Sequence, residues 1–281
     1  MVFAAACTTS RITCRNRCSL IRMPAHLQSG ASEPVLGFPI STRSLTECVD
    51  TIIAWLEEAQ PPRRYLVCAN PHSLVLAMRD TSFAAALHGA SMVIPDGVGI
   101  VLASRLNGGV IRRRITGSDL FGALNAKMNE QRRFSAFFLG STEETLSAIR
   151  VKMAEQFPHI KIAGTHSPPF RSEFSENDNR AMLRAVNESG ADVLWVGMTA
   201  PKQEKWIFEN IDRLQVQFAC AVGAVFDFFS GRAIRSSPIF QSLGLEWLPR
   251  LLREPRRLWY RNFVSSPKFI CEVLVQLKRN K

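Results

Sequence analysis

Asp96 is the first residue of this chain to which chemistry can be assigned, because it is a lone carboxylate at the end of an apolar run. It lies in VIPDGVGIVLASRL (93–106), where a Pro-Asp-Gly turn joins a predicted strand to a predicted helix. A carboxylate at this position can cap the helix by accepting hydrogen bonds from its free N–H groups. It can also act as a general base that removes a proton from a hydroxyl group. The stretch alone leaves both interpretations open.

Asn70, Gly140 and Ser141 follow other apolar runs in the same way, the first after RYLVCA and the other two at the end of FSAFFLGS. These residue types also form ordinary turns. In a parallel sheet, however, ligands bind at the carboxyl ends of the strands, where these residues would meet Asp96. Backbone amides at a strand–turn–helix junction suit a phosphate group. The three residues are therefore candidate substrate-binding residues, with turn formation as the alternative.

The block GMTAPKQEKW (197–206) ends another apolar run and begins a predicted helix. Its first turn contains Lys202, Gln203 and Glu204. A capped helix accounts for Pro201 and for Glu204. It does not account for Lys202, whose charge lies at the positive end of the helix dipole and is better placed beside an anion. This block is a further candidate for substrate binding.

Several kinds of site are disfavoured by missing motifs. The chain has no G-x-x-x-x-G-K-[ST] loop, and PDGVGIVLA lacks the third glycine of a dinucleotide-binding turn. The histidines are isolated and no two aspartates form a D-x-D pair, so the usual metal ligands are missing. No G-x-S-x-G motif indicates a serine hydrolase. We therefore expect no metal ion and no cofactor.

The tail LGLEWLPRLLREPRRLWYRNF (243–263) contains arginines at steps of three and four residues. They are Arg250, Arg253, Arg257 and Arg261. On one helix they would share a face, although two prolines must interrupt it. They can form a solvated basic face over a packed apolar stripe. They can also belong to an interfacial segment whose aromatic side chains enter lipid headgroups while the arginines meet phosphates.

The elements that would position these residues alternate regularly. Strand-like runs are predicted at 64–70, 91–95, 134–140, 160–164, 191–197 and 216–223, after a short strand or hairpin at 35–41. Helices are predicted at 45–59, 73–88, 98–106, 118–130, 142–156, 176–189 and 201–213. Strands that are apolar on both faces and joined by helices predict an α/β fold, with a mostly parallel sheet covered on both sides.

Composition limits the class of protein and its partners. The 281 residues carry a formal net charge of +11, which favours contact with phosphates or an anionic membrane. Nucleic acid is disfavoured because the basic residues concentrate in an aromatic tail and no recognition motif occurs. Seven scattered cysteines are typical of reduced thiols in a cytosolic protein. We expect an extra or disordered extension at 1–30, an α/β domain at 31–243 and a membrane- or lipid-binding appendage at 244–281.

Several longer blocks resemble the WecG/TagA/CpsF family of bacterial glycosyltransferases. They are NPHSLVLAMRD, IPDGVGIVLASRLNGGVIRRRITGSDLF, FFLGS, IAGTHSPPF, ADVLWVGMTAPKQEKWI, VGAVFDFFSGRAIRSSP and LGLEWLPRLLREPRRLWYR. They run in the family's order from about residue 65 to 261. The resemblance implies a Rossmann-like catalytic domain with a C-terminal basic helical appendage.

The resemblance also implies an activity. It is an inverting, metal-independent transfer of a sugar from a UDP-sugar to a polyprenyl-diphosphate-linked acceptor, in cell-surface or exopolysaccharide biosynthesis. The sugar is of the N-acetylmannosamine type, its uronic acid or a glucose type. Such an enzyme would lie in the cytoplasm, peripherally on the inner face of the cell membrane. A homo-oligomer is possible.

The family's site residues fall on matching positions of this chain. The resemblance implies that Asp96 is the base, that Asn70 and Arg114 line the pocket, and that Gln203 and Glu204 lie near the donor. It implies that the four tail arginines lie near the diphosphates or the lipid. Two positions depart from the family pattern, namely Thr199, where relatives have a small residue, and Cys68, where Thr is common. The alternative function is a non-catalytic peripheral membrane or nucleotide-binding protein.

Overall fold

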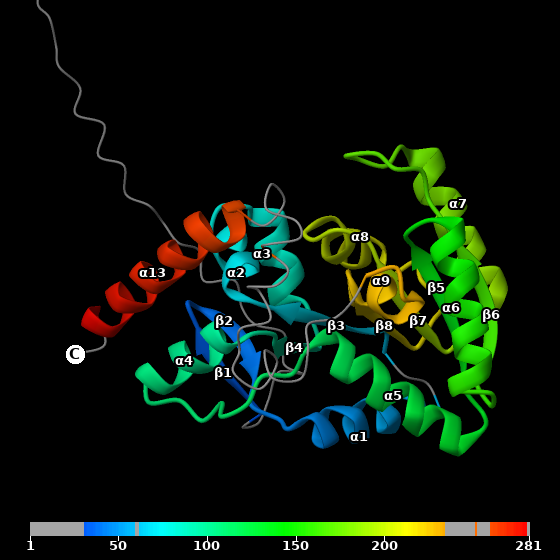
Figure 1. Ribbon diagram of the computed structural model, residues 1–281, viewed down its shortest axis with the longest axis horizontal. Helices are drawn as coiled ribbons and strands as arrows, with labels where there is room; N and C mark the ends of the chain where they lie inside the picture. The colour runs from blue at the N-terminus through cyan, green and yellow to red at the C-terminus, as the bar shows by residue number, and fades with distance from the viewer. Residues whose placement is uncertain (1–30, 60–61, 234–250, 252–258, 280–281) are drawn as a thin grey trace, which may run out of the picture.

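A six-stranded sheet lies at the centre of the protein, in the order β4-β3-β8-β7-β5-β6 (Figure 1). The structure is a computed structural model that describes residues 31–59, 62–233, 251 and 259–279. The strands are β3 (Arg64–Ala69), β4 (Met92–Pro95), β5 (Ser135–Gly140), β6 (Lys161–His166), β7 (Val193–Gly197) and β8 (Phe218–Ala221). Every neighbouring pair is parallel, so the six carboxyl ends meet at one edge. The predicted Rossmann-like α/β fold is confirmed.

Helices cover both faces of this sheet. They are α1 (Leu45–Leu56), α2 (Pro71–Ala77), α3 (Thr81–His88), α4 (Val98–Leu106), α5 (Gly117–Gln131), α6 (Glu143–Gln156), α7 (Glu176–Ser189), α8 (Lys202–Asn210), α9 (Val225–Ser230), the π-helix η2 (Tyr260–Ser265) and α13 (Ser266–Arg279). Alternate residues of a strand point to opposite faces, so Leu194 joins one core and Trp195 the other. The first core is completed mainly by α2, α3, α4, α7, α8 and α13, and the second by α1, α5, α6 and α9.

The helix predicted at 73–88 is wrong as one continuous element, because the structure has two helices there. Asn70 is the N-cap of α2, and Ser73 completes its capping box. Asp80 begins α3 by accepting a hydrogen bond from the backbone N–H of Phe83, at 3.0 Å. An aspartate that caps a new helix interrupts the old one, because its own backbone is extended.

Two other segments, a hairpin and a short helix, add detail to the prediction. Residues 35–41 belong to an antiparallel hairpin of β1 (Ser32–Val35) and β2 (Phe38–Ser41). Its turn contains Leu36 and Gly37, both with positive φ. The helix α9 was not predicted, because its six residues are too few to show a helical period. It directly follows β8 and so brings Asp227 to the carboxyl edge of the sheet.

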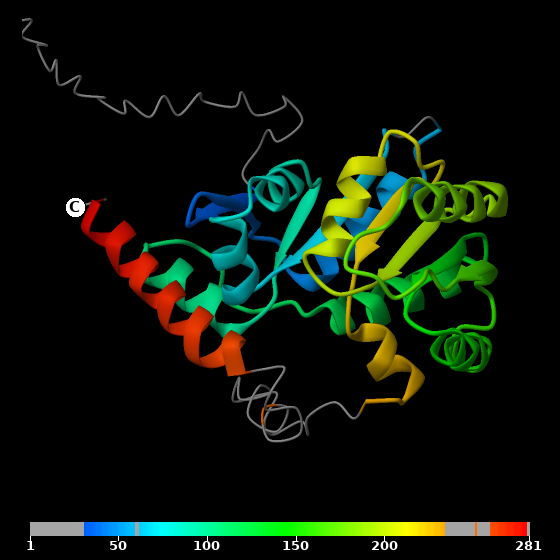
Figure 2. The same ribbon diagram turned by 90° about the horizontal axis from the view of Figure 1, so that it is seen from above.

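The C-terminal helix α13 packs against α2 and α4. Its side chains Phe269 and Val273 are buried in the first core, and Gln276 accepts a hydrogen bond from the backbone N–H of Leu36 at 3.2 Å. Figure 2 shows α13 running alongside α4. The predicted extension at 1–30 and the predicted boundary at 243/244 both lie outside the described residues, so the domain limits stay predictions.

Candidate active site

One cavity of about 1450 Å³ lies along the carboxyl edge of the sheet and continues to the C-terminal helix. Eight predicted site residues line it, namely Asn70, Asp96, Arg114, Ser141, Lys202, Gln203, Glu204 and Arg261. Gly140 is not among the lining residues. Arg250, Arg253 and Arg257 lie outside the described part of the chain. The sheet edge therefore gathers side chains that are up to 191 positions apart in sequence, from Asn70 to Arg261.

Asp96 directly follows β4 and is half-buried in the cavity wall. Its backbone N–H donates to the carbonyl of Ala69 at 2.7 Å, which fixes the turn against the end of β3. The N-cap position of α4 is occupied by Gly97, whose φ of 118° is unfavourable for residues with a Cβ atom. Asp96 therefore does not occupy the N-cap position of α4.

Arg114 lies on the loop between α4 and α5, and two contacts hold this loop at the sheet edge. The backbone N–H of Ile115 donates to the carbonyl of Pro95 at 2.8 Å. Thr116 then begins α5 in a capping box with Asp119. Since Pro95 directly precedes Asp96, the loop brings Arg114 to the same end of β4 as the candidate base.

Asn70 and His72 form the wall after β3. The side-chain oxygen of Asn70 accepts from the backbone N–H of Ser73 at 3.0 Å, so its amide nitrogen is what it can offer to a ligand. His72, which follows Asn70 after the same strand, also lines the cavity. Its Nδ1 lies 2.8 Å from the hydroxyl of Ser265, and its ring meets Tyr260 edge-on. Burial, followed by the charge of Arg261, lowers the pKa of His72 and favours the neutral ring.

Gln203 and Glu204 are almost completely buried, with exposed fractions of 4% and 2%. The side-chain oxygen of Gln203 accepts from the backbone N–H groups of Met198, at 3.1 Å, and Gly223, at 3.0 Å. Its amide nitrogen donates to Glu204 Oε1 at 2.8 Å. Gln203 therefore ties the ends of β7 and β8 together, and Glu204 holds its amide in the required orientation.

Glu204 has an unusual protonation equilibrium for a carboxyl group. Its Oε2 is buried without a hydrogen-bond partner among the described residues. Burial raises its pKa to about 7. The neighbouring thiols are affected in turn, since burial and then Glu204 raise the pKa of Cys220. Burial is also the main cause of the raised pKa of Cys68, to which Asp96 and Glu204 both contribute.

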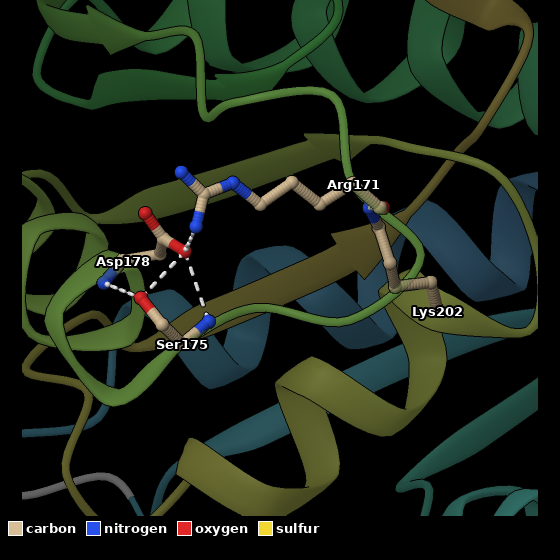
Figure 3. A network of polar contacts seen from close by, with 4 residues as sticks. All are labelled: Arg171, Ser175, Asp178 and Lys202. Carbon is tan, nitrogen blue, oxygen red and sulfur yellow. Dashed lines mark hydrogen bonds and ion pairs between the residues drawn. The ribbon is translucent and has the colours of Figure 1, made fainter.

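Lys202 lines the cavity, but its ammonium group already has partners in the protein. It donates to the carbonyl of Arg171 at 2.6 Å and lies 4.0 Å from the centre of the Phe174 ring. Burial lowers its pKa. Figure 3 shows the network beyond it, where Asp178 accepts hydrogen bonds from Ser175 and pairs with Arg171. Lys202 thus holds the loop between β6 and α7 in place. The sequence did not predict this contact.

Gly140 and Ser141 shape the cavity wall after β5 in different ways. Gly140 has a φ of 120°, and a Cβ atom there would lie 2.5 Å from the carbonyl oxygen of Gly197. It therefore allows β5 and β7 to approach closely at their ends. Ser141 faces the cavity, and its carbonyl accepts from the hydroxyl of Ser167 at 2.7 Å.

The charged groups of the cavity have both signs. The basic lining residues are Arg114, Lys202 and Arg261, and the lining residues with carboxyl groups are Asp96, Glu143, Glu144, Glu204 and Asp227. Within the described ranges, no group of three or more His, Cys, Asp or Glu side chains could hold a metal ion. A search of the same ranges finds no helix with the length and hydropathy needed to cross a membrane. The arrangement suits binding of an anionic ligand beside a carboxylate that can take a proton.

Comparison with known proteins gives one family. The profile of the glycosyl transferase WecG/TagA/CpsF family matches residues 33–281. A protein of Bacillus spizizenii is 32% identical over 210 residues, which cover 75% of this chain and 78% of that protein. A Bacillus subtilis protein is 26% identical over 89% of this chain and 94% of its own, and a Staphylococcus aureus protein is 25% identical over 86% and 92%. All three are named N-acetylglucosaminyldiphosphoundecaprenol N-acetyl-beta-D-mannosaminyltransferase.

Proposed function

The chain belongs to the WecG/TagA/CpsF family of glycosyltransferases, and we propose that it moves a sugar from a UDP-sugar to a polyprenyl-diphosphate-linked acceptor. The names of the three relatives support an N-acetylmannosamine-type sugar and an acceptor that carries N-acetylglucosamine. The resemblance also allows two other donors, namely the UDP-linked uronic acid of N-acetylmannosamine and a UDP-linked sugar of the glucose type. The observation that carries the proposal is that Asp96, Arg114 and Arg261 line the same cavity.

In the proposed mechanism, Asp96 removes the proton from the acceptor hydroxyl as its oxygen attacks the anomeric carbon. The new glycosidic bond forms while the bond from that carbon to the diphosphate breaks, and UDP leaves with the electron pair. Attack opposite the leaving group inverts the anomeric configuration. A positioned base contributes about 10²–10⁴-fold to the rate.

Charge on the departing diphosphate has to be stabilised without a metal ion in this mechanism. We assign that role to Arg114 and to the backbone amides at the beginning of α6, whose capping residue Thr142 lines the cavity. One preorganised hydrogen-bond donor of this kind contributes roughly 3 kcal/mol to transition-state stabilisation. Asn70 contributes its amide nitrogen, and Gln203 with Glu204 shapes the wall between β7 and β8.

The location that fits this substrate is the inner face of the cell membrane, to which the protein would bind peripherally. Exposed Trp259, Tyr260 and Phe263 flank Arg261 in the sequence, and this mixture of aromatic and basic side chains suits a headgroup region. Arg250, Arg253 and Arg257 belong to the same proposed surface by sequence alone. Assembly into a homo-oligomer stays a prediction.

The variant Asp96→Asn tests the proposed base, since it keeps the size of the side chain and removes its basicity. We expect the transfer rate to fall by about 10²–10⁴-fold, with the affinity for UDP unchanged within twofold. The matched control is Asp212→Asn, because Asp212 is exposed and does not line the cavity. Initial rates and calorimetric titration with UDP measure the two properties. Near-normal transfer by Asp96→Asn would contradict the assignment.

A further inference from the structure

An apolar groove lies between α4 and α13, and we call it the α4–α13 groove. Its rims are Val98, Leu102 and Leu106 of α4 and Phe263, Ile270 and Leu274 of the C-terminal segment. Figure 2 shows the two helices side by side. Buried Ala103, Phe269 and Val273 also line it. The spacing of four residues along each helix places these side chains on the faces that look toward each other.

The rim residues are too exposed for an ordinary core. Leu102 is 52% exposed, Leu106 59%, Ile270 58% and Leu274 49%. Single exposed apolar residues are common on protein surfaces, but a contiguous set is typical of a binding site. The row from Val98 to Leu106 extends over about 12 Å of helix, which is long enough for an extended apolar segment.

The groove and the catalytic cavity are one continuous space. Val98 is two residues from Asp96, and both line the same cavity as Leu106. Arg261 and His72 line the part where the C-terminal segment meets the catalytic body. A ligand that fills the whole space would therefore need a hydroxyl group near Asp96, an anionic group near Arg261 and an apolar chain between α4 and α13.

We propose that the α4–α13 groove binds the isoprene units of the acceptor that are nearest to its diphosphate. This inference rests on the proposed function, whose acceptor joins a sugar, a diphosphate and a long apolar chain in that order. The lining of the one cavity contains a surface for each part, namely Asp96, the basic Arg261, and apolar side chains of α4 and α13. The remaining chain stays in the bilayer, because the groove is only two helical turns long on the α4 side.

The test uses water-soluble acceptors without vesicles or detergent, so that insertion into a bilayer cannot affect the result. The same diphosphate-linked N-acetylglucosamine carries either a farnesyl or an ethyl group. We expect the wild-type protein to prefer the farnesyl acceptor at least tenfold in kcat/KM. In Leu102→Ser/Leu106→Ser the preference should fall to about twofold or less, while the rate with the ethyl acceptor stays within twofold of wild type.

The matched control is Val275→Ser, since Val275 is an exposed apolar residue of α13 that does not line the cavity. It should keep the full preference for farnesyl. A retained preference in Leu102→Ser/Leu106→Ser, or a wild-type protein that does not distinguish the two acceptors, would overturn the proposal. A variant that floats with vesicles less than wild type, yet keeps the preference, would identify the groove as a membrane-insertion face and also overturn it.

Binding of farnesyl diphosphate tests the groove even if the proposed transfer reaction does not occur. If neither acceptor is converted, the transfer reaction itself fails. Calorimetry then tests the groove directly, with wild type expected to bind farnesyl diphosphate at least tenfold more tightly than Leu102→Ser/Leu106→Ser. Equal affinities would refute the groove, and UDP affinity checks that the variant is folded.

Discussion

At the scale of single residues, Glu204 determines how the cavity wall at the ends of β7 and β8 is held together. Gln203 has to present its oxygen to two backbone N–H groups, so its amide nitrogen must find an acceptor on the other side. Glu204 Oε1 is that acceptor. The cost is a carboxyl group in a buried position whose second oxygen has no partner among the described residues. This arrangement makes the stability of the fold sensitive to pH.

The variant Glu204→Gln tests this sensitivity, because Gln keeps an acceptor for Gln203 and does not ionise. The pKa of Glu204 is raised to about 7 in the folded protein, so folded wild type retains a proton that the unfolded chain loses from about pH 4.5 upward. Wild type should therefore lose stability relative to Glu204→Gln as the pH rises toward 7, and not on acidification. We expect the difference in unfolding free energy to change by about 2 kcal/mol between pH 5 and pH 8. Urea unfolding of both proteins measures it, and a constant difference would contradict the buried carboxyl group.

Gly140 affects the site through the backbone, because it lets the ends of β5 and β7 approach closely. In Gly140→Ala, the new Cβ atom would lie 2.5 Å from the backbone of Gly197, at a φ that disfavours side chains. We expect a loss of about 2–4 kcal/mol in unfolding free energy. Gly122→Ala is the control, because Gly122 lies within α5 with open space around its Cβ position and should gain about 0.5–1 kcal/mol. Denaturant unfolding that shows equal effects for the two variants would refute the close approach of β5 and β7.

At the scale of elements, the loop between β6 and α7 depends on a contact from another element. The ammonium group of Lys202 holds the carbonyl of Arg171 from the first turn of α8 (Figure 3). Arg171 and Ser175 then connect the loop to Asp178 in α7, and hydrogen bonds from Ser175 are the main cause of the lowered pKa of Asp178. Phe170, fully exposed on this loop, lines the cavity, so loop order should affect substrate access.

Lys202→Met distinguishes this role from the anion-binding role predicted from the sequence. If Lys202 fastens the loop, the amides of residues 167–174 should exchange hydrogen at least threefold faster in the variant. The control Lys205→Met removes another lysine of α8, which pairs with Asp80, and should leave the exchange of this loop unchanged. Unchanged exchange in Lys202→Met with weakened UDP binding would instead support direct contact with an anion.

The sequence predicted the central strands well and the connections less well. Parallel strands buried on both faces are short apolar runs, which is why β5 and β7 could be located from sequence alone. The division of 73–88 into α2 and α3 was missed, since the cap at Asp80 interrupts a continuous apolar pattern. Helix α9 is too short to show a period.

The site could be predicted where it depends on strand ends and not where it depends on distant partners. Asn70 and Asp96 follow β3 and β4, whose parallel pairing brings them to one edge. The contact of His72 with Ser265 joins positions 193 residues apart, and no local pattern predicts it. The partners of Lys202 were missed for the same reason, because a sequence gives the charge of a side chain but not the groups that it contacts.

At the scale of the whole molecule, one cavity extends from the carboxyl edge of the sheet to the C-terminal helix. The shared core residues Phe269 and Val273 hold α13 against the catalytic body. Asp96 lines this cavity, and so do the apolar side chains between α4 and α13. The proposed acceptor, which is polar at one end and apolar at the other, would use both surfaces.

The mass of the product made by the purified protein shows directly whether a sugar is transferred. It is incubated with a polyprenyl-diphosphate-linked N-acetylglucosamine and a panel of UDP-sugars in the presence of EDTA. We expect that one UDP-sugar, with UDP-N-acetylmannosamine as the first candidate, adds one sugar residue to the acceptor and releases UDP. No added sugar from any donor, or release of UDP without growth of the acceptor, would contradict this expectation.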